Sequence, residues 1–344
     1  NLFPLLLKDN DKQTLNTQLT FADHQYDNYN QWFRPSTSTL AINAGRDGEA
    51  SQNYSKSSLR SLEWVTNYTN SWGKHNLKAM LGYSFEYDVY AGFNADNKDF
   101  PNDALTYNNL GTGTFAKEKG ELGMGSFKND TKLISFFGRL SYDWKGRYML
   151  TASLRREGSS KFGANHKWGS FPAVSAGWRI SDEPFMENTK SWLTDLKLRA
   201  DYGITGNQNF DSYKSLNTMS GFGYYTYNGK YYQVWGPGKN VNTDLRWEKG
   251  KNWNIGLDWT LLNGRLYGSF NYFSRHQQDL LGDYNVSVPP YLFTSTFVNV
   301  GSMRNSGFEF DVTWNAIKTK DFSYTLNIVG STMNNKFIDF SNSQ

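Results

Sequence analysis

The sequence predicts an all-β fold, an antiparallel up-and-down transmembrane β-barrel, from three observations: period-two alternation, connections sorted by length, and aromatic residues near strand ends. The alternation is clearest between Lys74 and Tyr90, where apolar residues occupy every second position and Lys78, Glu86 and Asp88 lie between them. An extended chain with this period has one apolar face. Aromatic residues make up 17% of the 344 residues, and 31 glycines against 8 prolines suit strands joined by tight turns.

About eleven stretches alternate in this way, and we predict each of them as a strand. They are residues 13–22, 59–70, 74–90, 131–144, 147–157, 171–181, 194–205, 250–260, 264–274, 305–316 and 321–331.

The links between these strands alternate in length. The short links lie near residues 71–73, 145–146, 182–193, 263–264 and 318–321. The long links cover residues 23–58, 91–130, 158–170, 206–245 and 275–304. Short turns on one edge and long loops on the other are typical of an outer-membrane barrel with periplasmic turns and extracellular loops. The alternative, a soluble protein of two packed sheets with one wet face, has no reason to sort its loops.

The alternation also predicts which side of each strand meets lipid. Lys197, Arg199 and Asp201 alternate with apolar residues, and so do Glu309 and Asp311. Because a basic residue facing lipid at mid-bilayer costs about 2–4 kcal/mol, the charged side should line a wet or plugged lumen. Aromatic residues near the short links should form a periplasmic girdle, where a ring reaches both lipid and water. They are Trp64, Tyr68, Tyr142, Trp144, Tyr148, Trp259, Trp314 and Tyr324.

Composition excludes several classes of function. The net charge of +4 comes from 36 basic and 32 acidic residues spread along the chain, without the basic runs of a nucleic-acid-binding protein. The mean hydropathy of -0.68 argues against membrane-spanning helices, but not against strands that are apolar only at alternate positions. The chain has no cysteine, which removes disulfides and thiolate chemistry.

No constellation in the sequence points to catalysis, a cofactor or a metal. The four histidines, His24, His75, His166 and His276, are far apart and form no metal-ligand pair. No nucleophile with a neighbouring base can be recognised. We therefore expect a protein that is not an enzyme and has no catalytic residue, no cofactor and no metal.

The most specific string runs from Arg155 to Glu183, RREGSSKFGANHKWGSFPAVSAGWRISDE. It resembles the signature of the SusC/RagA family of TonB-dependent outer-membrane transporters, in which a Gly-Ser-Ser-Lys-Phe-Gly loop is followed by Trp-Gly-x-Phe-Pro-x-Val-Ser-x-Gly-Trp-Arg-Ile-Ser. Further segments resemble this family in the same order: Phe100 to Asp103, Tyr107 to Gly111, Leu198 to Asn207, Trp247 to Lys249 with Asn254 to Asp258, and Val298 to Glu309.

The resemblance implies a barrel of roughly 22 strands around an N-terminal plug, with a periplasmic TonB box for energy coupling and a SusD-like surface lipoprotein as a lid. About half of such a wall is expected here, so residues 1–344 are predicted as one partial barrel domain. No plug or TonB box can be recognised. The opening residues Asn1 to Leu7 resemble the middle of a longer chain, and the end, Asp339 to Gln344, stops short of a terminal membrane strand.

The signature loop, Gly158 to Gly169, is predicted to be architectural. Its glycines permit positive φ in a tight extracellular loop, and Lys161 or His166 can satisfy nearby carbonyl groups. The residues that match the family here are Gly158, Ser159, Ser160, Lys161, Phe162, Gly163, Trp168 and Gly169.

A second loop, residues 206–245, is the candidate for substrate or lid contact. Flat aromatic faces with amide neighbours suit the stacking of sugar rings or the binding of a peptide. Packing of the loop on itself and docking onto the lipoprotein lid are alternatives, since aromatic residues are also enriched at protein interfaces. The candidate residues are Tyr224, Tyr225, Tyr227, Tyr231, Tyr232 and Trp235.

The resemblance implies a multi-pass protein in the outer membrane of a Gram-negative cell. Its expected function is import of a nutrient, an oligosaccharide or a peptide, together with TonB and a SusD-like lipoprotein, and without a nucleic-acid partner. The alternatives are a plug-free diffusion porin and a surface interaction or adhesion protein on the same scaffold. A plug and TonB box upstream of Asn1 would favour active transport, and their absence from the complete reading frame would favour the alternatives.

Overall fold

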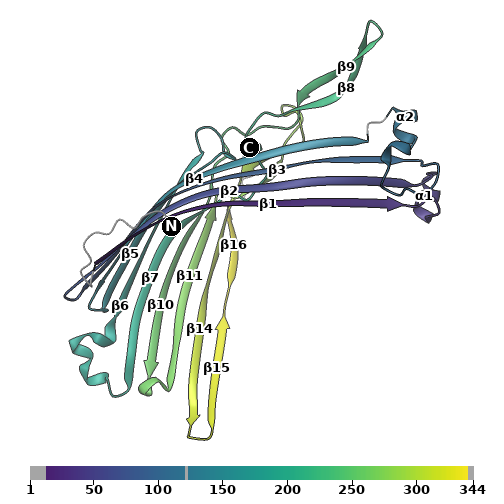
Figure 1. The fold of residues 1–344 in the computed structure, drawn as a ribbon. Coiled ribbons are helices and arrows are strands. Elements are labelled where there is room, and N and C mark those ends of the chain that lie inside the picture. Colours follow the sequence, from purple (N-terminus) through teal and green to yellow (C-terminus); the bar gives the residue numbers. More distant parts are fainter. Residues whose placement is uncertain (1–12, 121–122, 340–344) are drawn as a thin grey trace. The chain divides into compact units, whose positions relative to one another are not determined.

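The computed structural model describes residues 13–120 and 123–339, in which most regular structure is extended (Figure 1). The predictions made for Asn1 to Leu7 and for residues 340–344 lie outside these ranges. The described residues form two α-helices of one turn each, α1 (Thr39–Asn43) and α2 (Phe115–Lys119). Short 3₁₀ helices are η1 (Leu110–Thr112), η2 (Ile180–Asp182), η3 (Pro184–Thr189) and η4 (Leu262–Gly264). No helix in the described ranges is long and apolar enough to cross a membrane.

The main sheet has the strand order β1-β2-β3-β4-β5-β6-β7-β10-β11-β14-β15. Neighbours in the sheet follow the order of the chain, apart from two hairpins inserted between sheet strands, as in an up-and-down meander. This confirms the predicted all-β fold. The strands are β1 (Gln13–Arg34), β2 (Glu49–Trp72), β3 (His75–Lys98), β4 (Met124–Trp144), β5 (Tyr148–Ser159), β6 (Trp168–Arg179), β7 (Leu193–Asn207), β10 (Glu248–Leu261), β11 (Leu266–Gln278), β14 (Ser302–Lys318) and β15 (Ser323–Ser331).

Several strands are longer than the alternation predicted, and the loops are correspondingly shorter. β1 continues to Arg34 and β2 begins at Glu49, so the loop predicted at 23–58 is reduced to residues 35–48. β3 continues to Lys98 and β4 begins at Met124, so the link predicted at 91–130 is also shorter, and the loop predicted at 158–170 is reduced to residues 160–167. In the added part of β1, polar residues and the aromatic residues Tyr26, Tyr29, Trp32 and Phe33 are mixed on both sides of the strand. Backbone pairing continues there although hydrophobic periodicity has ended, because water in place of lipid no longer requires an apolar face.

Two of the predicted long loops contain hairpins. Residues 206–245 include β8 (Met219–Tyr227) and β9 (Lys230–Pro237), and residues 275–304 include β12 (Leu281–Asn285) and β13 (Ser295–Asn299). The turn between β8 and β9 is Asn228-Gly229, and both residues have positive φ, 48° and 71°. Asn-Gly between aromatic runs is a strong hairpin signal. The sequence predicted only a long link at residues 206–245, without this hairpin.

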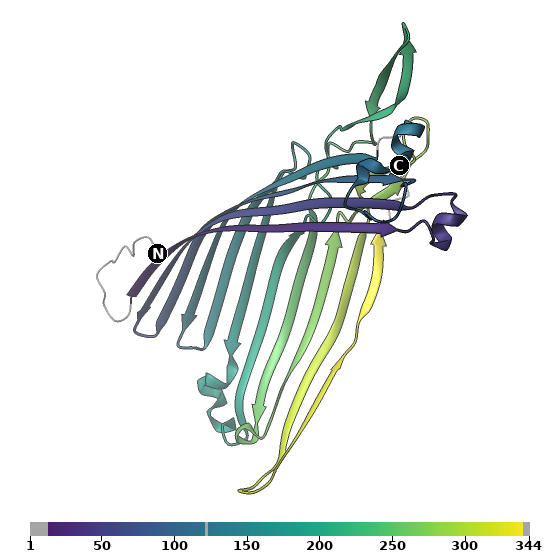
Figure 2. The ribbon, with the colours of Figure 1, turned by 45° about the vertical axis from the view of Figure 1, so that its right-hand side comes forward.

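The last strand is interrupted rather than finished at Ser331. β15 pairs with residues 309–318 of β14, and β16 (Asn334–Asp339) pairs with residues 302–306 of the same strand. The two segments follow one another along β14 (Figure 2). The break falls at Thr332 and Met333, where no ladder pairing is formed.

Two compact units can be distinguished. Within the described residues, unit 1 comprises residues 13–19, 63–84 and 133–339, and unit 2 comprises residues 20–62, 85–120 and 123–132. The strands β1 to β4 contribute residues to both. The single partial barrel domain expected for residues 1–344 stays a prediction.

Unit 2 has a small core of its own at α1 and α2. Its buried apolar residues are Ala41, Ala50, Phe100 and Phe115. The guanidinium of Arg46 lies 3.9 Å from the ring centre of Phe115 and donates to the Asp99 carboxylate at 3.1 Å. Asp103 accepts hydrogen bonds from the backbone N–H of Ser36 at 3.1 Å and from its hydroxyl at 2.9 Å. The segment Phe100 to Asp103 therefore holds the loops of this unit together.

In unit 1 the short turns lie along one edge of the sheet, and the loops that follow β5, β7 and β11 leave from the opposite edge (Figure 1). Adjacent turns are joined by backbone hydrogen bonds, in which the N–H of Lys145, Arg179, Leu262 and Asn315 donates to the carbonyl oxygens of Lys74, Arg147, Trp192 and Arg265 at 2.8, 2.8, 2.8 and 2.7 Å. The sorting of links by length therefore corresponds to the two edges of a real sheet.

Candidate functional site

One face of the unit 1 sheet is apolar and uncovered. Directly paired residues of antiparallel strands share a face. One such row crosses six strands and contains Leu150, Ala176, Ala200, Ile255, Tyr272 and Phe308. Leu150, Ile255 and Phe308 are 50%, 49% and 61% exposed. Soluble monomeric proteins rarely expose a contiguous apolar surface of this kind. This face therefore needs an apolar environment.

The opposite face of the same sheet is polar, and its charges are paired across strands. Arg199 donates from Nε and Nη2 to the two carboxylate oxygens of Asp258 at 2.7 and 2.8 Å, and from Nη2 to Asn271 at 2.9 Å. Further along the sheet, the Asn327 amide donates to the Asp311 carboxylate at 3.0 Å. Arg199 and Asp311 are on the side that the alternation predicted for the lumen. A bidentate arginine pair of this kind also fixes the spacing of three neighbouring strands.

The loops at the far edge of unit 1 share one hydrophobic core. Phe162 of the signature loop, Leu245 and Trp247 are 1%, 0% and 3% exposed, and Phe171 of β6 is also buried with them. The ring centres of Phe162 and Trp247 are 4.5 Å apart. The indole N–H of Trp247 donates to the carbonyl oxygen of Lys167 at 3.0 Å. The loops between β5 and β6 and between β7 and β10 are therefore one packed layer.

The glycines of the signature loop are required because neighbouring backbone or ring atoms lie too close to leave room for a side chain. A Cβ on Gly163 would lie 1.8 Å from the carbonyl oxygen of Thr243, and the Gly163 N–H donates to the carbonyl oxygen of Leu245 at 2.9 Å. Side chains at Gly158 and Gly169 would likewise meet an aromatic ring at 2.8 and 2.4 Å. None of these three residues has a positive φ. The reason that the sequence suggested, a left-handed backbone, was therefore wrong, because packing distances cannot be read from residue type.

Lys161 links the signature loop to the loop that follows β7. Its ammonium donates to the carbonyl oxygen of Phe210 at 2.7 Å, and its own carbonyl oxygen accepts from the Ser215 hydroxyl at 2.9 Å. Lys161 thus satisfies a carbonyl group, one of the two options that the sequence offered. His166 lies 3.9 Å from the carboxylate of Asp244 at the surface.

The remaining signature residues take two different positions. Ser159 is buried, and its N–H donates to the carbonyl oxygen of Lys167 at 3.0 Å, closing the loop. Trp168 is exposed on the apolar side of the sheet, where its ring stacks on Phe136 with 6.3 Å between ring centres. Ser160 lies in the turn between them.

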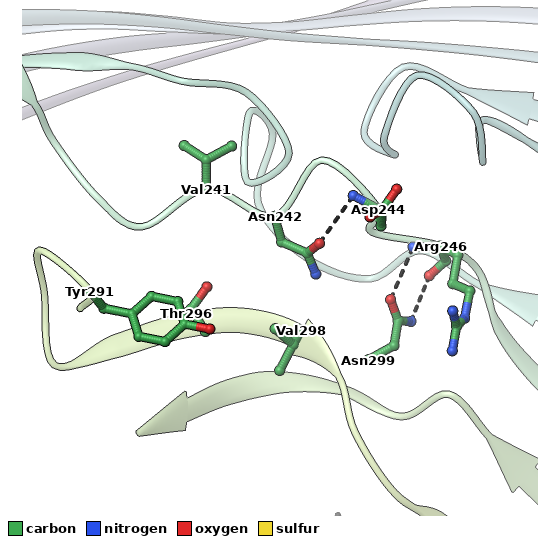
Figure 3. A pocket seen from close by; sticks show the side chains of 8 residues that line it. All are labelled: Val241, Asn242, Asp244, Arg246, Tyr291, Thr296, Val298 and Asn299. Atoms are coloured by element: carbon green, nitrogen blue, oxygen red, sulfur yellow. Dashed lines mark hydrogen bonds between the residues drawn. The ribbon is translucent and has the colours of Figure 1, made fainter. Parts of the chain in front are cut away.

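A pocket of about 310 Å³ opens beside the loop core (Figure 3). On one side, the Asn299 amide donates to the carbonyl oxygen of Arg246 at 2.7 Å and accepts from its N–H at 3.0 Å, as a backbone segment would. Asn242 accepts from the N–H of Asp244 at 3.0 Å. Asn299 continues the wall formed by Tyr291, Thr296 and Val298, and the opposite wall carries Val241, Asn242, Asp244 and Arg246.

Sequence reasoning missed this pocket because its walls come from two segments about fifty residues apart. The signal that could have found it is the spacing of asparagines at 240, 242 and 299. Asn240 donates to the carbonyl oxygens of Phe293 and Ser295 at 2.6 and 2.9 Å, and Asn242 donates to that of Phe297 at 3.3 Å, so both bridge the two segments as Asn299 does.

The six candidate aromatic residues lie together on the β8–β9 hairpin, which stands away from the sheet of unit 1 (Figure 1). All six are exposed, up to 78% for Tyr231. The pairing divides them between two faces. Tyr225 and Tyr232 pair directly and stack at 5.5 Å, with Tyr227 on the same face. The other face carries Tyr224, Tyr231 and Trp235.

Glu248 is a buried carboxylate at the start of β10 that ties the loop layer to the sheet. It accepts hydrogen bonds from the side chains of Gln277 at 2.9 Å and Asn207 at 3.3 Å, and from the N–H of Leu281 at 3.4 Å. Three strands and the β12–β13 hairpin therefore meet at one group. Glu248 lies within the Trp247 to Lys249 segment, which is one of those that resemble the family.

Comparison with known proteins gives this geometry a family. Residues 4–343 match the family described as TonB dependent receptor-like, beta-barrel. The chain belongs to the TonB-dependent receptor family. It is 32% identical over 309 residues to TonB-dependent receptor P3 of Formosa agariphila, covering 89% of this chain and 30% of the relative. It is 38% identical over 198 residues to TonB-dependent receptor SusC of Bacteroides thetaiotaomicron, covering 56% of this chain and 20% of the relative.

Among solved structures, the fold is similar to that of the RagAB peptide transporter, with a TM-score of 0.81, 22% identity, and 98% of this chain but 36% of that chain covered. The predicted resemblance to SusC and RagA is thereby confirmed. The chain spans less than a third of the length of the curated relatives named above. The family is one of outer-membrane receptors, not of enzymes, as the sequence predicted.

Membership in the TonB-dependent receptor family assigns the two edges and two faces of the sheet. The short turns are periplasmic, the loop layer is extracellular, and the apolar face meets lipid. Near the short turns, Trp144 and Tyr148 stack at 5.5 Å, and Tyr148 and Trp314 are exposed on the apolar face, as the predicted aromatic girdle requires.

The periplasmic turn between β6 and β7 is fastened by Glu183, which sequence reasoning treated only as the end of the family string. Its carboxylate accepts from Trp178 at 3.0 Å, from Arg147 at 3.0 Å and from the Tyr148 hydroxyl. These hydrogen bonds, first that of Tyr148 and then that of Trp178, together with the charge of Arg147, hold the pKa of Glu183 below its ordinary value. The turn thus stays docked while Glu183 is ionised.

Proposed function

We propose that the chain is part of the barrel wall, with extracellular loops, of a TonB-dependent transporter that imports an oligosaccharide across the outer membrane. The observation that carries the proposal is the division of the unit 1 sheet into an exposed apolar face and a paired polar face. A wall with one lipid face and one wet face suits a barrel through which a polar solute passes. Membership in the TonB-dependent receptor family supports energy coupling through TonB.

The extracellular groups of unit 1 support a sugar rather than an apolar nutrient. Tyr224, Tyr231 and Trp235 offer flat faces on one side of the hairpin. A separate open pocket of the loop layer is lined by the polar residues Asp244, Tyr291 and Thr296. Aromatic faces with convergent polar groups are the usual features of a small-ligand site. A peptide is the alternative substrate, and the likeness of the fold to the RagAB peptide transporter keeps it in the test.

A SusD-like surface lipoprotein is the proposed partner on the extracellular side. The hairpin is suited to such a contact because an isolated two-stranded hairpin is only marginally stable in water and exposes tyrosines, which are enriched at interfaces. The same six aromatic residues of the hairpin are therefore the candidates both for contact with the lid and for contact with the substrate.

The structure allows a sharper test than deletion of the whole loop 206–245, because residues 208–215 and 243–247 contribute to the loop core or its hydrogen bonds. In the complete protein, residues 219–237 would be replaced by a Gly-Ser linker that leaves both flanks in place. We expect normal membrane levels, with reduced uptake of oligosaccharide or reduced recovery of the lipoprotein on affinity purification. Unchanged values for both would contradict the role of the hairpin.

Active transport is tested separately from the hairpin. Deleting tonB should abolish uptake of the same oligosaccharide in cells with the wild-type protein, whereas a plug-free porin would continue to pass it by diffusion. Competition by short peptides of similar mass distinguishes the two substrate classes. If peptides block uptake and other sugars do not, the proposed substrate is a peptide instead of an oligosaccharide.

A further inference from the structure

A second pocket lies on the polar face of the unit 1 sheet, apart from the pocket of the extracellular loops. Its volume is about 480 Å³, and its walls come from β3, β4, β5, β6 and β7, all within unit 1. Ser153 of β5 pairs with Arg139 on one side and with Ala173 on the other, and Ala173 pairs with Gly203. Gly203 alternates with Arg199 along β7, so all of these residues share the face of the Arg199 side chain. The pocket therefore opens towards the lumen.

The pocket adjoins the loop core. Phe171, which lines the pocket, is buried in that core together with Trp247. Gly206 also lines it, and a Cβ on Gly206 would lie 2.3 Å from the Phe171 ring. The extracellular loop layer thus lies at one end of the pocket. A solute that has passed these loops would meet the pocket on the luminal side.

Arg139 contributes a guanidinium that has no ion-pair partner. Its side chain is exposed, and within residues 13–120 and 123–339 it forms no ion pair or hydrogen bond. The carboxylate that lines the same pocket, Glu157, pairs with Arg155 instead. A guanidinium presents its N–H donors in a flat fork that matches the two oxygens of a carboxylate. Arg139 is therefore available to bind a carboxylate from a ligand.

Arg155 and Glu157 are held in place by a buried serine. Arg155 donates from Nη2 to the Ser135 hydroxyl and to Glu157 Oε1, both at 2.8 Å. Ser135 is fully buried and donates to the same Oε1 at 2.7 Å. All these hydrogen bonds use one oxygen of Glu157, and the described residues place no donor on Oε2. The pocket thus combines one uncompensated positive charge with one open acceptor.

The rest of the lining suits a ring that carries hydroxyl groups. Ser153 supplies a hydroxyl, and Met80 and Phe137 supply an apolar surface. The Phe137 ring lies over Gly82, where a Cβ would be 2.2 Å from it. An acidic sugar offers a carboxylate, hydroxyl donors for Glu157 Oε2 and an apolar C–H side. A sulfate group offers no donor to Glu157 and places a second anion beside it.

We propose that this pocket binds a uronic acid residue of the imported oligosaccharide. The inference rests on the proposed import of an oligosaccharide and names its substrate class. The guanidinium of Arg139 binds the sugar carboxylate, Glu157 accepts from a ring hydroxyl, and the C–H side of the sugar packs on Phe137. Arg155 is a positioning residue, because it orients Glu157.

The test uses the complete protein in an uncharged maltoside detergent. Trimers of galacturonate, glucuronate, mannuronate and guluronate are titrated beside their carboxyl-reduced, neutral counterparts, and binding is measured by calorimetry. We expect at least one acidic trimer to bind about tenfold or more tightly than its neutral counterpart. Arg139→Gln should abolish this preference and leave the affinity for the neutral trimer unchanged, because only the contact with the carboxylate is lost.

Two further variants separate the charge from its position. Arg156→Gln removes the same charge from the opposite side of β5 and should keep the preference. Arg139→Lys keeps the charge without the fork and should bind the acidic trimer more tightly than Arg139→Gln does. Since Arg139 is exposed and has no partner among the described residues, its substitution leaves no buried group unpaired, and membrane levels should stay normal. Arg155 is unsuitable for this test because its loss would also release Ser135 and Glu157.

Several results would overturn the inference. They are the absence of a preference for any acidic trimer, a preference that survives Arg139→Gln, an equal loss in Arg156→Gln, and tighter binding of sulfated trimers or acidic peptides than of uronates. Uptake measured in cells then distinguishes this failure from that of the proposed function. TonB-dependent uptake of neutral sugars alone would overturn the uronic acid site and leave oligosaccharide import standing, whereas uptake of peptides alone would overturn both.

Discussion

The loop core around Phe162 and the β8–β9 hairpin are both extracellular and aromatic, but the rings of the core are buried and those of the hairpin are exposed. In the core, Phe162 and Trp247 are almost fully buried against each other, and in the hairpin Tyr225 and Tyr232 stack while still exposed. Ring stacking alone therefore does not distinguish architecture from recognition. Burial does, because only a buried ring contributes its full transfer free energy to the fold.

The largest effect is expected from emptying the loop core. Phe162→Ala removes a buried ring and should lower the free energy of unfolding of the loop layer by about 3–5 kcal/mol. Limited proteolysis of the complete protein in detergent, with loop cleavage followed against temperature, measures the change. Tyr231→Ala on the hairpin is the matched control and should change it by less than about 0.5 kcal/mol. If both variants became equally sensitive to protease, the proposed difference between the loop core and the hairpin would be contradicted.

A slightly smaller loss is expected at Gly163. Gly163→Ala places a methyl group against the Thr243 carbonyl oxygen, so one backbone segment has to move, at a cost of about 1–3 kcal/mol. The same proteolysis assay applies. Gly282→Ala adds a methyl group where nothing lies within 4 Å and should be close to neutral. A neutral Gly163→Ala variant would show that the loops are not rigidly packed there.

The periplasmic edge should respond to acid through Glu183. Since the folded state lowers the pKa of Glu183, its contribution is complete above the ordinary carboxyl pKa near 4.5 and is lost as the pH falls through the lower folded value. Thermal unfolding of the wild-type protein should therefore become easier below about pH 4.5, beyond the general acid effect. Glu183→Gln should be less stable at neutral pH and lack this increment. Parallel pH profiles for the two proteins would contradict the assignment.

The smallest effect on stability, with the most specific effect on function, is expected on the hairpin. Replacing Tyr224, Tyr231 and Trp235 together with alanine leaves the core untouched, so loop stability should change by less than about 0.5 kcal/mol. Oligosaccharide uptake should nevertheless fall if this face contacts the ligand. The corresponding triple variant of the other face, Tyr225, Tyr227 and Tyr232, identifies which side is used. If both triple variants keep wild-type uptake and wild-type recovery of the lipoprotein, the proposed role of the hairpin is contradicted.

Much of the sheet followed from residue order, and much of the loop layer did not. The alternation around Leu196 to Tyr202 placed Arg199 on the polar side, where it pairs with Asp258. The extension of β1 to Arg34 escaped prediction because its polar and aromatic residues are mixed on both sides, so that it shows no lipid-driven period. The asparagine-lined pocket escaped as well, since Asn242 and Asn299 meet only through the packing of separate loops.

The sequence alone determined the all-β fold, the sorting of its turns and loops, and the family, because each depends on local period, turn residues or a contiguous string. Only the tertiary structure decided which individual residues are buried, exposed or closely packed. It buried Phe162, left the hairpin tyrosines exposed, and made Gly163 indispensable through distance rather than φ. The physical reason is that the alternation of residues in an amphipathic strand shows which side meets lipid and which meets water. The environment of a loop side chain, by contrast, is made by segments far away in the chain.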